Sequence, residues 1–204
     1  MKLPVSNTNA PVWRDITVKS ELPSDLKPLE ELSKNLWWVW NSEGKSLFRD
    51  LDPELWRASG ENPVMLLQHL STDRLEEIAA DKELMARIVK VYADFKAYMG
   101  KPMRKDVPSV AYFSMEYGLC NCLKIYSGGL GVLAGDYIKE ASDSCVDMTA
   151  VGFLYRYGYF TQTLSVDGQQ IANYEPQNFN QLPIEQVCDK NGNPVILEVP
   201  YPGR

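Results

Sequence analysis

The residues best suited to chemistry form a glycine-rich turn that opens a helical pattern. The turn spans residues 126–136 and reads YSGGLGVLAGD. Glycine lets a ligand approach the backbone because it has no Cβ atom, and the first N–H groups of a helix have no partner within the helix. Together with the positive end of the helix dipole, this arrangement favours a phosphate group. A second interpretation stays open, in which the glycines only allow a strand and the helix to pack closely.

The cysteines and the single histidine lack the spacing of a metal site. The cysteines are Cys120, Cys122, Cys145 and Cys188; they contain no C-x-x-C pair, and the closest two are separated by one residue. A zinc site would need a cysteine-only arrangement of unusual spacing, because His69 is far from them in sequence. We therefore predict reduced thiols, no metal, and a structural or surface role for His69 on a helix.

Composition and charge exclude several kinds of partner. The chain has 204 residues, a formal net charge of −6 and a pI near 4.9. Because neither a basic run nor a basic helix face is present, nucleic acid and an anionic membrane surface are excluded, and a neutral or small substrate is favoured. The first residues lack the apolar core of a signal peptide and no stretch approaches the length of a membrane span, so we expect a cytoplasmic location.

The first hundred residues have the apolar spacing of helices. One helix is predicted to begin at Pro28, with an apolar face formed by Leu29, Leu32, Leu36 and Trp40. A second helix should follow a cap at Ser71 or Thr72. A longer helix, ended by Gly100 and Pro102, should present Leu84, Ile88, Val91, Phe95 and Tyr98 on one side.

A tryptophan-rich cluster at residues 35–41, NLWWVWN, has two interpretations. Flat apolar rings suit the faces of glucose units, so the cluster is a candidate sugar-stacking platform. The same residues lie on the apolar stripe of the predicted helix, which favours core packing.

After Pro108 the pattern changes to that of an α/β fold. Buried strands are predicted at residues 109–115 and 148–155, with a helix from the glycine-rich turn to about residue 142 between them, an order typical of a parallel sheet. Hairpins are predicted around Asp167-Gly168 and Asn191-Gly192. Such a sheet is incomplete, so we expect an N-terminal piece of a longer protein. The expected division is an N-terminal segment (1–24), a helical unit (25–100) and the start of an α/β domain (108–204).

The turn can also be read as the dinucleotide-binding pattern G-x-G-x-x-A, from Gly129 to Ala134. That pattern places the glycines directly after the first strand and an acidic residue at the end of the second. Here about a dozen residues separate strand and glycines, and Asp147 precedes the next strand. A nicotinamide or flavin enzyme is therefore a weaker alternative.

Three ordered motifs resemble the α-glucan phosphorylases, the family of glycogen, starch and maltodextrin phosphorylases. They are AYFSMEYG at 111–118, IYSGGLGVLAGD at 125–136 and VGFLYRYGYFTQ at 151–162. The helical half is similar to the N-terminal extension of the short bacterial and archaeal branch, through NLWWVWN at 35–41, LDPELW at 51–56 and NPV at 62–64. The resemblance covers nearly all of residues 25–204.

The resemblance implies a glycosyltransferase of the GT-B kind, built from two Rossmann-like domains, of which this chain supplies the opening of the first. The reaction would be reversible phosphorolysis of a terminal α-1,4-linked glucose of a glucan by inorganic phosphate, giving glucose 1-phosphate. The cofactor would be pyridoxal 5′-phosphate on a lysine outside this chain, and its phosphate would serve the acid–base chemistry. By motif matching, the phosphate-binding loop would be Gly128, Gly129, Leu130 and Gly131.

Glu116 matches a glutamate of the family close to the sugar and the cofactor, which implies a positioning role; taken alone, a glutamate at a strand end is more often solvated. No catalytic residue is expected in this stretch, because the family's lysine and its basic and sugar-binding residues come from later sequence. A stand-alone carbohydrate-binding or regulatory module is the competing function. The sequence leaves open whether the chain forms a homo-oligomer.

Overall fold

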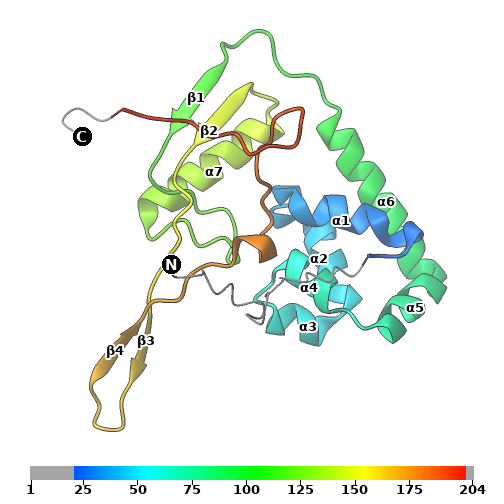
Figure 1. Cartoon of the computed structure of the whole chain (residues 1–204). Coiled ribbons are helices and arrows are strands. Elements are labelled where there is room, and N and C mark those ends of the chain that lie inside the picture. Colours follow the sequence, from blue (N-terminus) through cyan, green and yellow to red (C-terminus); the bar gives the residue numbers. More distant parts are fainter. Residues whose placement is uncertain (1–20, 201–204) are drawn as a thin grey trace, which may run out of the picture.

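The computed structural model describes residues 21–200, a group of helices followed by strands around one further helix (Figure 1). Most of the expected N-terminal segment, residues 1–24, lies outside the described residues. The helices of the first part are α1 (Lys27–Lys34), α2 (Ser42–Leu51), α3 (Pro53–Ala58), α4 (Pro63–His69), α5 (Thr72–Ala80) and α6 (Lys82–Met99), with 3₁₀ turns at Ser24–Leu26 and Leu36–Val39. The predicted helical character of this part is confirmed.

Side-chain caps define where most of these helices begin. The capping residues of α2 to α6 are Asn41, Asp52, Asn62, Ser71 and Asp81, and each accepts a hydrogen bond from a backbone N–H of the first turn. Such caps satisfy donors that have no acceptor within the helix. The predicted cap and helix after Ser71 and the long helix up to Gly100 are both confirmed.

The helix predicted to run from Pro28 through Trp40 is wrong in its second half. α1 ends at Lys34, and Asn35 is extended with φ −99° and ψ 127°. The side chain of Asn35 accepts the backbone N–H of Trp37 at 3.0 Å and starts a separate 3₁₀ turn. A short amide side chain can compete with helical hydrogen bonds in this way, and apolar spacing alone does not detect it.

Tryptophans from the cluster at residues 35–41 fill the core of the helical part. Trp38 is 2% exposed and meets Phe48 and Trp56 edge-on, with ring centroids 6.1 and 6.0 Å apart. Trp37 is 4% exposed and lies 5.6 Å from the ring of Phe95. These rings are not available to stack on a sugar, so the core-packing interpretation is confirmed for them.

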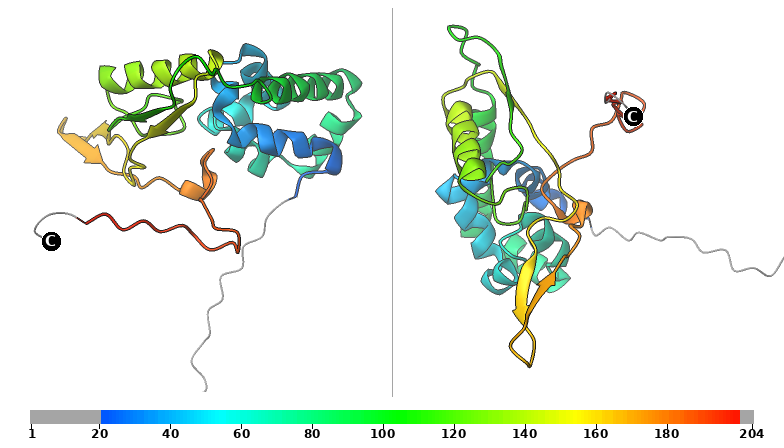
Figure 2. Two further views of the ribbon diagram at one scale, coloured as in Figure 1. Left: turned by 90° about the horizontal axis from the view of Figure 1, so that it is seen from above. Right: turned by 90° about the vertical axis from the view of Figure 1, so that its left-hand side faces the viewer.

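The second part contains a parallel strand pair with a crossover helix. Strands β1 (Val110–Phe113) and β2 (Met148–Val151) pair in parallel, and α7 (Gly129–Asp143) connects them and packs beside them (Figures 1 and 2). This order was predicted. The mixed helix and strand content agrees with the predicted α/β class.

The first predicted hairpin forms and the second forms only in part. β3 (Thr161–Leu164) and β4 (Gln170–Asn173) pair antiparallel and project from the rest of the molecule, with Gly168 at φ +76° in the turn (Figure 1). The turn at Gly192, φ +83°, closes only an isolated bridge between Cys188 and Pro194.

The prediction that β1 and β2 are buried strands is wrong for the described residues. Phe113 is 71% exposed, and Val110 and Val151 are also exposed. The described sheet has these two strands and one covering helix, so apolar side chains on the other face have no layer to pack against. The apolar pattern therefore marks a face that no described element covers.

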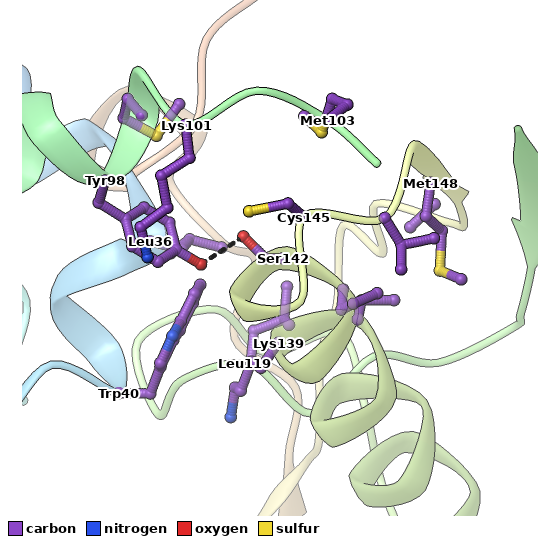
Figure 3. Close-up of a pocket in the computed structure, with 15 residues that line it drawn as sticks. Leu36, Trp40, Tyr98, Lys101, Met103, Leu119, Lys139, Ser142, Cys145 and Met148 are labelled. Atoms are coloured by element: carbon purple, nitrogen blue, oxygen red, sulfur yellow. Dashed lines mark hydrogen bonds between the residues drawn. The ribbon is translucent and has the colours of Figure 1, made fainter. Parts of the chain in front are cut away.

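The two parts meet where α6 approaches the end of α7. The hydroxyl of Tyr98 hydrogen-bonds Ser142 and donates to Asp143, each at 2.7 Å, and Trp40 Nε1 donates to Asp143 at 3.1 Å. Burial, with the hydrogen bond to Asp143, raises the pKa of Tyr98 to about 12. A cavity of about 290 Å³ lies at this junction, lined also by Met103 (Figure 3). Among residues 21–200, no helix is both long and apolar enough to cross a membrane.

Candidate functional site

The glycine-rich turn lies at the N-terminus of α7, as predicted. Gly128 is the N-cap, in an extended conformation, and Gly129 is the first helical residue. Val132 N–H donates to Gly128 O at 3.1 Å. This is the bond that closes the first turn of α7, so the N–H groups before Val132 have no acceptor within the helix. Within the described part of the chain, the N–H groups of Gly129 and Leu130 have no acceptor. These donors lie at the positive end of a fifteen-residue helix, a geometry that suits an anion.

Glu116 folds back onto the same turn. Its carboxylate accepts hydrogen bonds from Ser127 N at 3.0 Å, from Ser127 Oγ at 2.6 Å and from Gly128 N at 3.4 Å. The bond from the Ser127 hydroxyl, followed by the backbone donors, holds the pKa of Glu116 below its usual value. The chain thus supplies its own carboxylate to one side of the turn and leaves the amides of Gly129 and Leu130 uncovered.

The glycines of the turn divide into two groups. A Cβ atom on Gly131 would lie 2.5 Å from Tyr126 Cβ, and one on Gly135 would lie 2.1 Å from Gly118 O, so both positions require glycine for close packing. A Cβ atom on Gly128 or Gly129 would meet nothing within 4 Å. Close packing therefore accounts for the later glycines, and the two at the helix start face open space.

A pocket of about 200 Å³ adjoins the turn and has an aromatic lining. Its walls include Glu116, Lys124, Tyr126, Ser127, Tyr155, Tyr157, Gly158 and Tyr159. The hydroxyl of Tyr159 donates to Ser127 O, and that of Tyr155 donates to Met115 O at 2.9 Å. The pocket thus offers tyrosine side chains, one carboxylate and one ammonium group next to Ser127 of the turn.

Part of this pocket was not predicted from the sequence. Lys124, Tyr155, Tyr157 and Tyr159 are not among the site residues that the sequence predicts. The alternation of tyrosines at 155, 157 and 159 was a usable signal, since every second residue of an extended segment faces the same side. Of the predicted residues, Glu116, Gly128 and Gly131 come together, and the side chain of Leu130 is 59% exposed.

The direct connection that a dinucleotide-binding turn requires is missing. β1 ends at Phe113 and α7 begins at Gly129, so an irregular segment separates the strand from the glycines. Among residues 21–200, no group of three or more His, Cys, Asp or Glu side chains is placed to share a metal ion.

The chain matches, over residues 22–123, the family described as Protein of unknown function (DUF3417), and it belongs to that family. The match covers the helical part, β1 and the segment up to Leu123.

Characterised relatives with longer chains carry more specific names. The chain is 40% identical over 198 residues to "Glycogen phosphorylase" of Mycobacterium tuberculosis (strain ATCC 25618 / H37Rv), covering 91% of this chain and 23% of that protein. It is 39% identical over 194 residues to "Maltodextrin phosphorylase" of Thermococcus litoralis, covering 92% of this chain and 23% of the relative. The match to "Glycogen phosphorylase" of Aquifex aeolicus is 42% over 168 residues, 80% of this chain and 24% of the relative.

The predicted resemblance to glycogen and maltodextrin phosphorylases is thereby confirmed. The chain spans less than a quarter of the length of these relatives. No solved structure gave a significant match to the chain.

Proposed function

We propose that this chain is the opening part of an α-glucan phosphorylase, which splits terminal α-1,4-linked glucose from a glucan with inorganic phosphate and releases glucose 1-phosphate. The observation that carries the proposal is 40% identity to a glycogen phosphorylase across 91% of this chain. The glycine-rich turn supports it independently, because uncovered amides at a helix start suit a phosphate substrate.

The proposed architecture is of the GT-B kind, with residues 25–100 as a helical extension and residues 108–204 as the start of the first Rossmann-like domain. The parallel β1–α7–β2 arrangement supports this assignment, since it is the repeating unit of such domains. The exposed apolar face of β1 and β2 is consistent with a sheet that further segments complete.

The phosphate-binding role is assigned to the turn Gly128–Gly131. Backbone donors of Gly129 and Leu130 would bind phosphate oxygens, and the open space above Gly128 and Gly129 leaves room for the group. Glu116 would hold the turn in position through Ser127 rather than contact the phosphate, because two negative groups would repel each other.

Pyridoxal 5′-phosphate fits the same surface through its phosphate group alone. The described residues offer backbone amides and open space for that group, and the lysine that would carry the cofactor is proposed to lie outside this chain. When bound, the cofactor would supply a phosphate group for acid–base chemistry. The contribution of this chain is to bind and orient the phosphates at Gly129 and Leu130 and to fix the turn with Glu116.

The proposed partners are an α-1,4-glucan and inorganic phosphate, and the proposed location is the cytoplasm. The competing function, a carbohydrate-binding or regulatory module, depends on accessible tryptophan rings. Trp37, Trp38 and Trp56 are at most 4% exposed, and the half-buried Trp40 donates its Nε1 to Asp143, so the described tryptophans give that alternative little support.

The test is an assay of phosphorolysis with the native protein that contains this sequence, captured by an antibody raised to residues 21–100. We expect release of glucose 1-phosphate from maltodextrin only when inorganic phosphate is present. The isolated 204-residue chain should release none. No phosphorolysis by the captured protein would overturn the proposal, as would full activity of the isolated chain.

The role of the turn is tested by Gly129→Ala in the active protein. The added Cβ meets no atom of this chain, so the fold should be retained, but it enters the space assigned to phosphate. We expect kcat/KM for phosphate to fall at least about tenfold. Val89→Ala, at an exposed position of α6, is the matched control and should leave kcat/KM unchanged. Equal kinetics for both variants would contradict the assignment.

A further inference from the structure

Two cysteines separated by one residue lie in direct contact. Cys120 and Cys122 flank Asn121 in a turn of the segment between β1 and α7, and both thiols are free. Their Sγ atoms are 3.1 Å apart. The turn therefore points both sulfurs to the same side, and the separation needed for a disulfide, about 2.05 Å, is roughly 1 Å away.

Buried neighbours hold this turn in place. Tyr117 before it is 4% exposed and Leu123 after it is 3% exposed. Backbone bonds from Tyr117 N to Ile125 O at 3.3 Å and from Ile125 N to Leu123 O at 3.0 Å close the segment on itself. Both cysteines are half-buried and pack against the core of the helical part. The fold therefore holds the two sulfur atoms in contact, in addition to their closeness in the sequence.

The two thiols are chemically unequal. The hydrogen bond between the two thiols, followed by backbone bonds from Leu123 and Cys122, lowers the pKa of Cys120, and burial opposes this shift. The same bond, with burial, raises the pKa of Cys122. Since the thiolate is the reactive form of cysteine, we take Cys120 as the attacking thiol of the contacting pair.

A metal site fits this geometry less well. Two sulfurs on one tetrahedral zinc ion are about 3.8 Å apart, farther than the observed contact. Zinc also needs further ligands, and no group of three metal-binding side chains occurs among residues 21–200. The arrangement favours a bond between the sulfurs themselves.

We propose that Cys120 and Cys122 form a reversible modification site that closes to an intramolecular disulfide by exchange with a small-molecule disulfide of the glutathione class. The Cys120 thiolate attacks one sulfur of the oxidant, which releases one glutathione thiolate and leaves a mixed disulfide. Cys122, after giving up its proton, attacks the Sγ of Cys120 and displaces the second glutathione. Two protein thiols are oxidised, one glutathione disulfide is reduced to two thiols, and excess glutathione reverses the exchange.

The position of the cysteine pair links the disulfide to the glycine-rich turn. The turn lies between Glu116 and Ser127, the two residues whose hydrogen bonds fix the glycine-rich turn. A new covalent link would tighten the segment that joins them. The proposal itself does not depend on the catalytic function proposed above.

The experiment equilibrates the full chain, with Cys145→Ser and Cys188→Ser introduced, against a series of oxidised-to-reduced glutathione ratios. Remaining thiols are then alkylated and counted by mass spectrometry. We expect both thiols to disappear together with the loss of two hydrogens and no retained glutathione. Thiols that stay free, or that each keep one glutathione, would overturn the proposal.

Two controls test whether disulfide formation needs the second thiol and whether it needs the folded chain. Cys122→Ser should leave Cys120 carrying one glutathione, because the resolving thiol is gone. In urea, where the contact is lost, the equilibrium constant for ring closure should fall at least about tenfold. An equal constant in folded and unfolded chain would show that the fold does not preorganise the pair, and would also contradict the inference.

Discussion

The helical part and the α/β part of this chain use apolar residues in opposite ways. In the helical part, large side chains such as Phe48, Leu66 and Phe95 are at most 2% exposed and form one continuous core. In the α/β part, Phe113 and Leu133 are 71% and 69% exposed. Both parts have regular secondary structure, although the described sheet of the α/β part has one uncovered face.

The difference lies in how many layers each part contains. Six described helices, α2 to α6 with side-chain caps, surround a shared interior, so the apolar face of each has a partner. A two-stranded parallel sheet with one helix covers one face only, although parallel strands are normally buried on both. An apolar pattern therefore predicts which side chains need cover, and the structure shows which of them receive it.

The largest expected effect comes from truncating the buried core. Phe48→Ala should lower the free energy of unfolding by about 3–5 kcal/mol, because the ring is fully buried between Trp38 and Trp56. Phe113→Ala removes the same atoms from an exposed strand and should change the free energy of unfolding by less than about 0.5 kcal/mol. Urea unfolding followed by tryptophan fluorescence measures Phe48→Ala, and amide hydrogen exchange of β1 measures Phe113→Ala. A large loss for Phe113→Ala would mean that the sheet face is covered in solution.

The fold could be predicted from sequence where a signal is local. The cap at Ser71, the long apolar spacing of α6 and the glycine turn before α7 gave the correct elements. The break at Asn35 was missed because a side chain outcompetes the helix backbone there, which apolar spacing does not report. Burial of β1 was wrong because it depends on layers outside the strand itself.

For the site, residue types were predictable and long-range contacts were not. Glycine at a helix start implies backbone amides that have no acceptor within the helix and that a ligand can approach. That Glu116 returns across eleven residues to bind Ser127 depends on the course of the segment between them. Which glycines are closely packed and which face open space also depends on the neighbouring backbone. Only the structure shows that Gly118 lies against Gly135.

The second prediction compares two glycines of α7, Gly135 in close packing and Gly129 in open space. Gly135→Ala places a Cβ 2.1 Å from the backbone oxygen of Gly118, which cannot move alone, and should cost about 1–3 kcal/mol. Gly129→Ala meets no atom and should be neutral or stabilise α7 by up to about 1 kcal/mol. Amide hydrogen exchange of α7 peptides, compared with α6, reports each change locally. Equal protection in the two variants would contradict the division of the glycines.

The smallest effect concerns the carboxylate that holds the turn. The pKa of Glu116 is lowered in the folded chain, chiefly by the Ser127 hydroxyl. Its stabilising contribution is therefore fully present above the unfolded pKa, about 4.5, and is lost as the pH falls through the folded value. Glu116→Gln removes this titration, so the stability difference between wild type and variant should shrink steadily below about pH 4.5.

Urea midpoints measured from about pH 7 to about pH 3 test this expectation, and the difference between the two curves cancels the other carboxylates. In a Ser127→Ala background the stability difference caused by Glu116→Gln should depend less on pH, because the hydroxyl that contributes most to the lowered pKa of Glu116 is gone. A difference that stays constant through the acidic range would mean that Glu116 is solvated rather than bound to the turn. The turn would then depend on packing at Gly131 and Gly135 alone, as the helical part depends on its core.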